Sequence, residues 1–180
     1  ETHLYHPEGV RRMTRLVEGV DSASWRDAVR SAHPAPIFLV GFPRSGTTLL
    51  DQILSSHPQL MCLEETEYLS VALAEVFSDP EKLARMHALD ADDIETVRAA
   101  YWREVLARNE IPPGVQVIDK LPLNIVVLPL IKAVFPDARI IFALRDPRDV
   151  VLSCYQQRFG MNVGMAQFLE LDRAAAYYDA

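Results

Sequence analysis

A short glycine-containing stretch, GFPRSGTT at residues 41–48, constrains the fold of this chain more than any other feature. The apolar run PIFLV at residues 36–40 precedes it and is typical of a buried strand. Residues 48–54 follow it with apolar side chains at helical spacing, and His57-Pro58 ends that pattern. The sequence therefore predicts a strand, a tight loop and a helix in direct succession, which is the context in which such a loop can bind an anion.

The spacing of this loop is that of the phosphate loop G-x4-G-K-[ST], with Thr48 at the last position and Thr47 in place of the lysine. Backbone N–H groups around Ser45, Gly46 and Thr47 would form a cradle for a phosphate-like group at the helix N-terminus. Arg44 supplies a positive charge from a different position. Because the missing lysine serves the β- and γ-phosphates, a triphosphate with magnesium is disfavoured. The alternative interpretation is an ordinary glycine-rich turn.

Length and composition are those of one globular domain, since the 180 residues are 49% hydrophobic and 24% charged. The net charge of -7 argues against a general nucleic-acid or membrane surface, so an anionic ligand needs a local basic cluster. Two cysteines are too few for a disulfide framework and favour a reducing, cytoplasmic compartment. No apolar run approaches the ~20 residues of a membrane helix, and the start has no signal-peptide pattern. Glu1 is not an initiator methionine, so we expect a longer chain.

The other segments alternate between strand-like and helix-like patterns, which predicts an α/β fold with a largely parallel sheet covered on both faces. Strands are expected at 59–63, 115–118 and 139–144, and helices at 8–33, 67–77, 91–109, within 121–135, at 147–158 and at 168–178, with a further helix starting at 78–80. We expect Asp90 and Asp146 to cap two of these helices, and Pro129 to lie near the start of another. The buried stripe expected for 91–109 contains Ile94, Val97, Tyr101, Val105 and Leu106, with Trp102 at its edge.

Three basic residues, Arg44, Lys120 and Arg145, each follow a predicted strand. Ligands of open α/β sheets bind at the carboxyl ends of the strands, so this convergence predicts a binding site. Ser153 lies two turns into the helix after Arg145, and a guanidinium with a hydroxyl can hold a second phosphate. The alternative is that Arg145 forms a salt bridge and that Ser153 is a small packing residue.

Acid–base chemistry has one candidate pair, Glu64-Glu65, of which one carboxylate would be a general base. The alternative is an acidic pair that interacts favourably with a helix dipole. Lys120 would stabilise a leaving phosphate or a developing sulfuryl charge, or would be a solvated lysine at a strand end. Arg148 is interpreted as a partner in a surface or structural ion pair. No Cys/His cluster has the spacing of metal ligands, so no metal is expected.

Together these motifs resemble the sulfotransferase family, in particular the branch of the tyrosylprotein sulfotransferases and of bacterial sulfotransferases that often carry tetratricopeptide repeats. PRSGTTLL at 43–50 is similar to the family's loop for the 5′-phosphosulfate, and RDPRDVVLS at 145–153 to its 3′-phosphate element. SSHPQLMCLEET at 55–66 resembles the segment with the catalytic glutamate, which falls on Glu65. DKLPLN at 119–124 resembles the segment whose lysine contributes to catalysis, here Lys120.

The resemblance implies a three-layer α/β/α fold of the P-loop type and transfer of a sulfuryl group from 3′-phosphoadenosine 5′-phosphosulfate without a metal. The product would be adenosine 3′,5′-bisphosphate. Arg44, Glu65 and Lys120 would be catalytic, and the donor would be held by Arg44, Ser45, Gly46, Thr47, Thr48, Arg145 and Ser153. The acceptor would be a small molecule, a carbohydrate or a peptide, with no nucleic-acid or membrane partner. Two rivals remain: a P-loop nucleotide kinase, and a nucleotide-binding module that has lost turnover.

The sequence departs from the resemblance in two places. Glu67 stands where tyrosylprotein sulfotransferases have an arginine that grips acidic peptides, which argues against a peptide-tyrosine acceptor. The chain also stops at Ala180, within a predicted helix, before the family's later segment. We therefore expect one domain with a helical lead-in at about 1–35, an α/β core at about 36–160 and an incomplete C-terminal helical part at 161–180.

Overall fold

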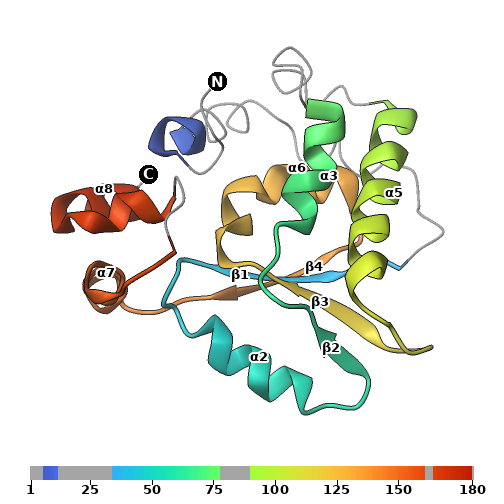
Figure 1. Ribbon diagram of the computed structural model, residues 1–180, viewed down its shortest axis with the longest axis horizontal. Coiled ribbons are helices and arrows are strands. Elements are labelled where there is room, and N and C mark those ends of the chain that lie inside the picture. The colour runs from blue at the N-terminus through green and yellow to red at the C-terminus, as the bar shows by residue number, and fades with distance from the viewer. Residues whose placement is uncertain (1–5, 12–33, 78–89, 161–163, 180) are drawn as a thin grey trace.

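The centre of the molecule is a parallel β-sheet. The computed structural model describes residues 6–11, 34–77, 90–160 and 164–179. Within them the sheet has the strand order β2-β3-β1-β4, formed by β1 (Ile37–Gly41), β2 (Leu60–Cys62), β3 (Gln116–Lys120) and β4 (Arg139–Ala143). The register pairs Ile37 of β1 with Ile118 of β3 and with Arg139 of β4. Because the strands are parallel, their carboxyl ends share one edge of the sheet (Figure 1).

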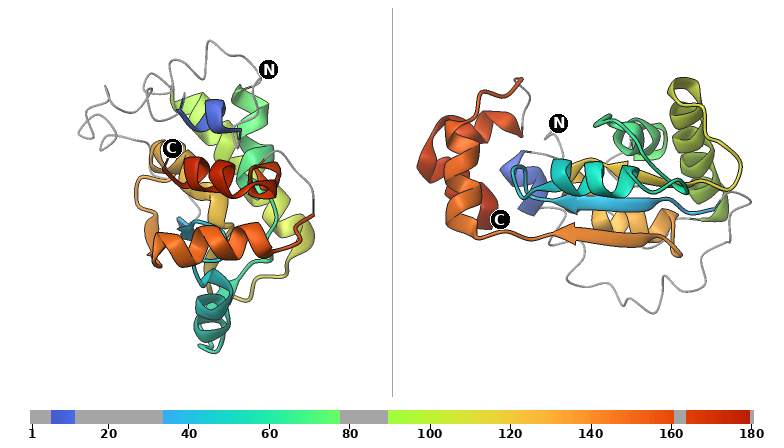
Figure 2. Two further views of the ribbon diagram at one scale, coloured as in Figure 1. Left: turned by 90° about the vertical axis from the view of Figure 1, so that its left-hand side faces the viewer. Right: turned by 90° about the horizontal axis from the view of Figure 1, so that it is seen from below.

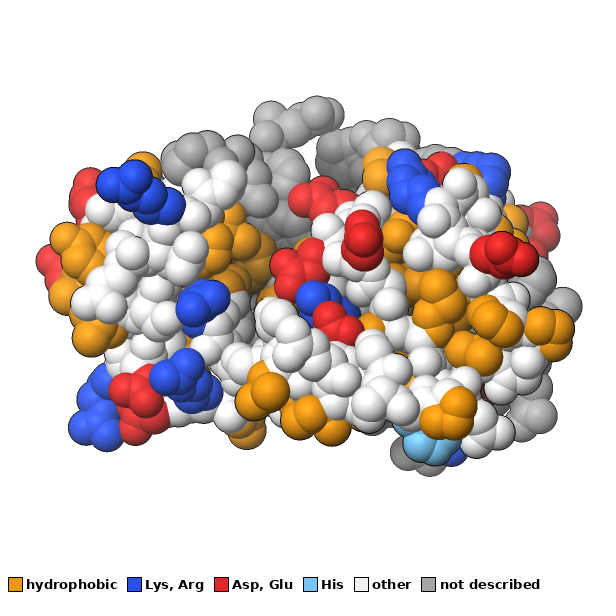
Figure 3. Space-filling model, turned by 60° about the horizontal axis from the view of Figure 1, so that its bottom comes forward, with side chains coloured by type: hydrophobic (Ala, Val, Ile, Leu, Met, Phe, Trp, Pro, Cys, Tyr) orange, Lys and Arg blue, Asp and Glu red, His pale blue; other side chains and the backbone are white. Residues whose placement is uncertain are grey.

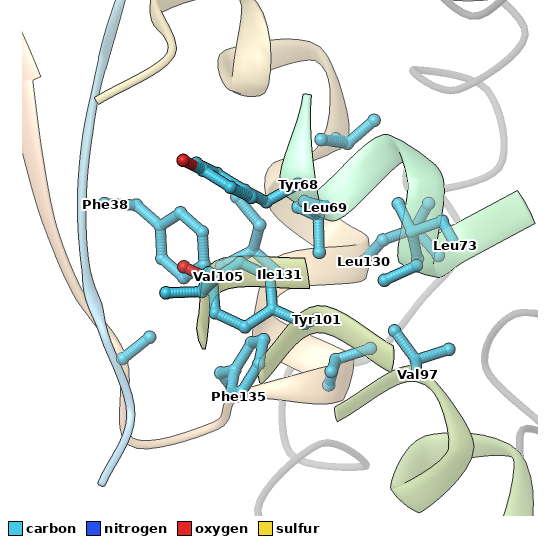
Figure 4. Close-up of a cluster of buried hydrophobic side chains, with 14 of the residues drawn as sticks. Phe38, Tyr68, Leu69, Leu73, Val97, Tyr101, Val105, Leu130, Ile131 and Phe135 are labelled. Atoms are coloured by element: carbon cyan, nitrogen blue, oxygen red, sulfur yellow. The ribbon is translucent and has the colours of Figure 1, made fainter. Parts of the chain in front are cut away.

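Helices cover both faces of this sheet, which confirms the three-layer α/β/α prediction. Helices α3 (Tyr68–Phe77), α5 (Ala91–Arg108) and α6 (Leu128–Val134) lie on one face, and α2 (Thr47–Ser55) lies on the other (Figure 1). The main core fills the first interface, where Phe38 of β1 packs against Tyr101 of α5 and Phe135 after α6 (Figure 4). Burial of these large rings stabilises the layer on which the strands rest.

A smaller apolar cluster lies beyond the carboxyl ends of the strands. It joins η3 (Pro122–Val127), α7 (Pro147–Gln156), η4 (Met165–Leu169) and α8 (Leu171–Asp179), and Figure 2 shows α7 and α8 side by side at this end. Phe42 packs against Phe168 and Tyr178, with ring centroids 5.6 and 4.9 Å apart. The loop after β1 is therefore fastened to the C-terminal helices.

Most predicted elements are confirmed to within a few residues, including both caps. The side chain of Asp90 accepts a hydrogen bond from the backbone of Asp93 at 2.8 Å, and that of Asp146 accepts one from the backbone of Arg148 at 2.9 Å. Pro129 lies in the first turn of α6. The predicted strand 115–118 is offset, because β3 continues through Lys120. The predicted strand 139–144 and helix 147–158 end earlier, at 143 and 156.

One prediction on α5 is wrong. Leu106 is 54% exposed rather than part of the buried stripe, because it lies about 100° around the helix from the fully buried Val105. The burial of Arg98 was not predicted either. Its side chain is buried and donates from Nε to the carbonyl of Val134 at 2.6 Å.

Two predicted segments fall largely outside the described residues. Residues 7–11 are helical, but the rest of the expected lead-in helix and the helix expected at 78–80 are not described. Among the helices that are described, none combines the length and the apolar character needed to cross a membrane.

Candidate functional site

The loop between β1 and α2, hereafter the glycine loop (residues 41–48), has a backbone that only a few residue types accept easily. Gly46 precedes α2 with φ 96°, and Arg44 has φ 71°. A side chain at Gly41 would place its Cβ 2.7 Å from the carbonyl oxygen of Ala143, so glycine allows β1 to approach β4 closely. Ser45 closes the turn, since its backbone N–H and its hydroxyl both donate to the carbonyl of Phe42, at 3.1 and 2.6 Å.

The N-terminus of α2 follows this turn directly. Its first intrahelical hydrogen bond runs from the N–H of Leu50 to the carbonyl of Gly46. The earlier N–H groups, from Thr47 to Leu49, have no acceptor within the helix, and they carry the positive end of its dipole. This is the local structure that the sequence predicted for an anion cradle.

A buried thiol holds the glycine loop against α7. Cys154 donates from Sγ to the carbonyl of Pro43 at 3.2 Å. Burial raises the pKa of the Cys154 thiol to about 12, so this donor keeps its proton at neutral pH. The contact fixes the start of the loop next to the helix that carries Ser153.

Two of the predicted arginines meet at this point, together with Ser153. Arg44 donates from Nε to Ser153 Oγ at 3.1 Å, and Arg145 donates from Nη1 to the carbonyl of Arg44 at 3.2 Å. Arg145 also lies 3.6 Å from the carboxylate of Asp149. Residues that are about a hundred positions apart in sequence thus form one basic group at the strand ends. Arg148, in contrast, is exposed and pairs with Asp146, which confirms its interpretation as a surface ion pair.

Lys120 lies between two carboxylates. Its Nζ is 3.0 Å from Asp51 Oδ2 of α2 and 3.0 Å from Glu65 Oε1 after β2. The side chain is only 8% exposed, so the alternative of a solvated lysine is wrong. Burial alone would lower the pKa of Lys120, but the hydrogen bonds and charges of Glu65 and Asp51 outweigh it and raise that pKa. The ammonium therefore stays charged, and it is held beside the predicted base.

Asp51 is the functional candidate that the sequence did not reveal. Burial would raise the pKa of its carboxyl, but hydrogen bonds from Lys120, Cys62 and Ser55 lower it overall. The only sequence signal is its spacing, four residues after Thr47 on the same face of α2. That spacing alone does not distinguish it from a solvated aspartate.

A cavity of about 500 Å³ lies at the strand ends, between these two charged groups. Arg44, Thr47 and Arg145 line it from the β1 and β4 side, and Glu65 and Glu67 line it from the β2 side. Figure 3 shows basic side chains on one side of this hollow, and acidic side chains with a basic one among them on the other. Gly46 and Thr48 also line it.

Three predicted site residues do not line the cavity themselves. Each is hydrogen bonded to a residue of the glycine loop or to a wall residue: Ser45 to Phe42, Lys120 to Glu65 and Ser153 to Arg44. The wall also contains Phe159 and Met165 from the smaller cluster, so its surface is both apolar and charged. This combination is typical of a site for an organic ligand with anionic groups.

The neighbour of Lys120, Asp119, belongs to the core instead. It accepts a hydrogen bond from Tyr101 at 3.0 Å and one from the amide of Asn124 at 3.4 Å. Burial raises the pKa of Asp119 to about 7. Successive side chains of a strand point to opposite faces, so Asp119 faces α5 while Lys120 faces α2.

In the described part of the chain, no set of three His, Cys, Asp or Glu side chains has an arrangement that could hold a metal ion.

Comparison with known proteins identifies the family. The profile of the sulfotransferase family matches residues 36–180, which is most of the chain. This chain belongs to the sulfotransferase family. The family resemblance of its motifs is thereby confirmed, and the loop, the arginines and the Lys120 group described above all lie within the matched region.

Similar proteins place this chain close to the protein-tyrosine sulfotransferases within that family. It is 30% identical to protein-tyrosine sulfotransferase 1 of Homo sapiens over 127 residues, which cover 68% of this chain and 34% of the human protein. It is 29% identical to a putative protein-tyrosine sulfotransferase of Caenorhabditis briggsae over 123 residues, 68% of this chain and 43% of that protein. An uncharacterized protein of Aquifex aeolicus is 33% identical over 147 residues, 76% of this chain and 19% of that protein. The chain thus spans less than half the length of these relatives.

Proposed function

We propose that this chain forms the donor site and part of the catalytic site of a sulfotransferase that uses 3′-phosphoadenosine 5′-phosphosulfate. The acceptor is a hydroxyl or an amine. The observation that carries the proposal is the hydrogen-bonded group of Arg44, Ser153 and Arg145. It joins the glycine loop to Arg145 before α7 and to Ser153 within α7, so two candidate anion-binding positions lie next to one cavity that Arg44 and Arg145 line.

The two positions suit the two anionic groups of this donor. The N–H groups at the start of α2, with Arg44 and Thr48, would hold the 5′-phosphosulfate. Arg145 and Ser153 would hold the 3′-phosphate, because a guanidinium and a hydroxyl together form charge-assisted hydrogen bonds to phosphate. Thr47 in place of a P-loop lysine is consistent with a donor that has no γ-phosphate.

The acidic side of the cavity suits proton transfer. Glu65 is 48% exposed and lines the cavity, so its carboxylate is accessible to the acceptor. It would take the proton from the acceptor as the acceptor oxygen or nitrogen attacks sulfur and the bond from sulfur to the bridging oxygen breaks. Lys120 and Arg44 would stabilise the charge on the departing adenosine 3′,5′-bisphosphate. The donor itself supplies the sulfuryl group.

The acceptor side of the cavity carries net negative charge. Glu67 lines it, and among the described residues its carboxylate has no ion-pair partner. The named relatives are protein-tyrosine sulfotransferases, so a tyrosine hydroxyl is one acceptor to test. An acidic peptide would be repelled at Glu67, whereas a neutral or basic one would not. A suitable panel contains tyrosine peptides with acidic or basic neighbours, a simple phenol, a sugar and an amine.

Nucleotide binding separates this proposal from the rival kinase. Titration calorimetry should show tight binding of adenosine 3′,5′-bisphosphate that a chelator does not change, and weak binding of ATP with or without magnesium. Magnesium-dependent ATP binding with no preference for the bisphosphate would refute the sulfotransferase donor site. Binding of the bisphosphate without any sulfate transfer by the full-length protein would instead support the inactive module.

A further inference from the structure

One ion-pair chain, Asp51–Lys120–Glu65, links α2, β3 and the loop after β2. We propose that Asp51 is a positioning residue, which holds the Lys120 ammonium in place while Glu65 exchanges its interaction with Lys120 for the acceptor proton. The inference rests on the proposed function, and it assigns a role to a residue outside the cavity wall.

The two carboxylates differ in how firmly they are held. Asp51 lies within α2, where Ser55 donates from Oγ to its Oδ1 at 3.1 Å. Its side chain is 23% exposed. Glu65 lies in the segment between β2 and α3, is 48% exposed and lines the cavity. Asp51 is therefore the fixed partner of Lys120, and Glu65 is the partner that can turn toward a ligand.

Proton transfer changes the charge balance around Lys120. When Glu65 takes the acceptor proton, its carboxylate becomes neutral and no longer compensates the ammonium. A buried ammonium without a counter-ion is strongly unfavourable, so Lys120 would move or Glu65 would resist protonation. Asp51 removes this conflict, because it remains ionised 3.0 Å from the same nitrogen.

The ammonium also keeps one donor for the reaction. A lysine has three N–H donors, and Asp51 and Glu65 take two of them. No third acceptor is found for Lys120 among the described residues. The remaining N–H is thus available to the group on which negative charge develops, provided that the ammonium stays where Asp51 holds it.

A double-mutant cycle tests this role. The variants are Asp51→Asn, Lys120→Met and the double variant, in the full-length protein, with sulfur-labelled donor and the best acceptor of the panel above. Asp51→Asn should lower kcat by about 10- to 100-fold, the scale of a misplaced catalytic group, and should leave the dissociation constant of adenosine 3′,5′-bisphosphate within about twofold. In the Lys120→Met background it should have no further effect on kcat, because it acts only through the ammonium.

The positioning role would be refuted if kcat is unchanged in Asp51→Asn. It would also be refuted if the loss of kcat in the double variant equals the product of the two single losses, because the two residues would then act independently. Either result leaves the sulfotransferase proposal intact. Asp92→Asn, an equivalent change on the exposed start of α5, should leave kcat unaltered. If Asp51→Asn does not fold, Asp51→Glu keeps the charge with a longer side chain and should show the same dependence on Lys120. A wild-type protein without transfer would refute the proposed function itself.

Discussion

Replacement of Arg145 by alanine should separate the two proposed anion positions of the cavity. The side chain lines the cavity and is half exposed, so its removal leaves no buried void. We expect Arg145→Ala to weaken adenosine 3′,5′-bisphosphate strongly and adenosine 5′-phosphate only slightly, because only the first ligand has a 3′-phosphate.

The magnitude follows from what Arg145 contacts. A hydrogen bond to a charged group contributes about 1.5–3 kcal/mol, or roughly a 10- to 150-fold change in the dissociation constant. The existing pair with Asp149, at 3.6 Å and exposed to solvent, offsets at most about 1 kcal/mol of this. The hydrogen bond from Arg145 to the carbonyl of Arg44 also disappears, but that loss affects both ligands equally.

Titration calorimetry with both ligands on the wild type and the variant measures the difference directly. Arg148→Ala is the matched control, since Arg148 is 90% exposed, is three residues away and pairs with Asp146. It should change neither affinity by more than about twofold, as expected for an exposed ion pair. Equal losses for the two ligands in Arg145→Ala would show that Arg145 supports the glycine loop and does not bind a 3′-phosphate.

Substitutions at Glu65, Glu64, Glu67 and Asp119 test other parts of the site and the core. Glu65→Gln should lower kcat by roughly 100-fold and leave the donor affinity nearly intact, whereas Glu64→Gln should leave kcat nearly unchanged. The reverse result would mean that Glu64, and not Glu65, is the base. Glu67→Arg should favour an acidic tyrosine peptide over a basic one, by about tenfold in the ratio of their kcat/KM values at low salt. If the variant keeps the wild-type preference, Glu67 does not select the acceptor. Asp119 has its pKa raised to about 7 by burial, so the stability that its neutral form provides is complete below pH 3.8 and is lost as the pH rises through about 7. In the wild type, the free energy of unfolding measured with urea should fall between about pH 4 and pH 7, and Asp119→Asn should reduce this fall. An equally large fall in the variant would contradict the raised pKa of Asp119.

The sequence predicted the layers well because each is encoded locally. Apolar runs mark β1 and β4, and the caps Asp90 and Asp146 mark the starts of α5 and α7. The positions of the basic residues after successive strands also follow from topology, because parallel strands bring their carboxyl ends together. The grouping of Arg44 and Arg145 could thus be predicted before any side chain was placed.

The charged residues that the sequence missed depend on contacts between distant segments. Asp51 is far from its partner Lys120 in the chain, and by itself it resembles an exposed helix residue. Arg98 is buried because the carbonyl of Val134, on another helix, accepts its hydrogen bond. Burial of a charge is decided by such partners, and no local pattern reports them. Leu106 shows the converse, since an apolar residue at the edge of a helical stripe is exposed when no neighbour covers it.

Transfer of labelled sulfate distinguishes a sulfotransferase from a nucleotide kinase. Full-length protein is incubated with sulfur-labelled 3′-phosphoadenosine 5′-phosphosulfate, the acceptor panel and a chelator, in parallel with ATP labelled at its γ-phosphate and magnesium. We expect label on at least one hydroxyl or amine acceptor from the sulfate donor, and none from ATP. Transfer of phosphate from ATP, with no transfer of sulfate to any acceptor, would contradict the proposed function.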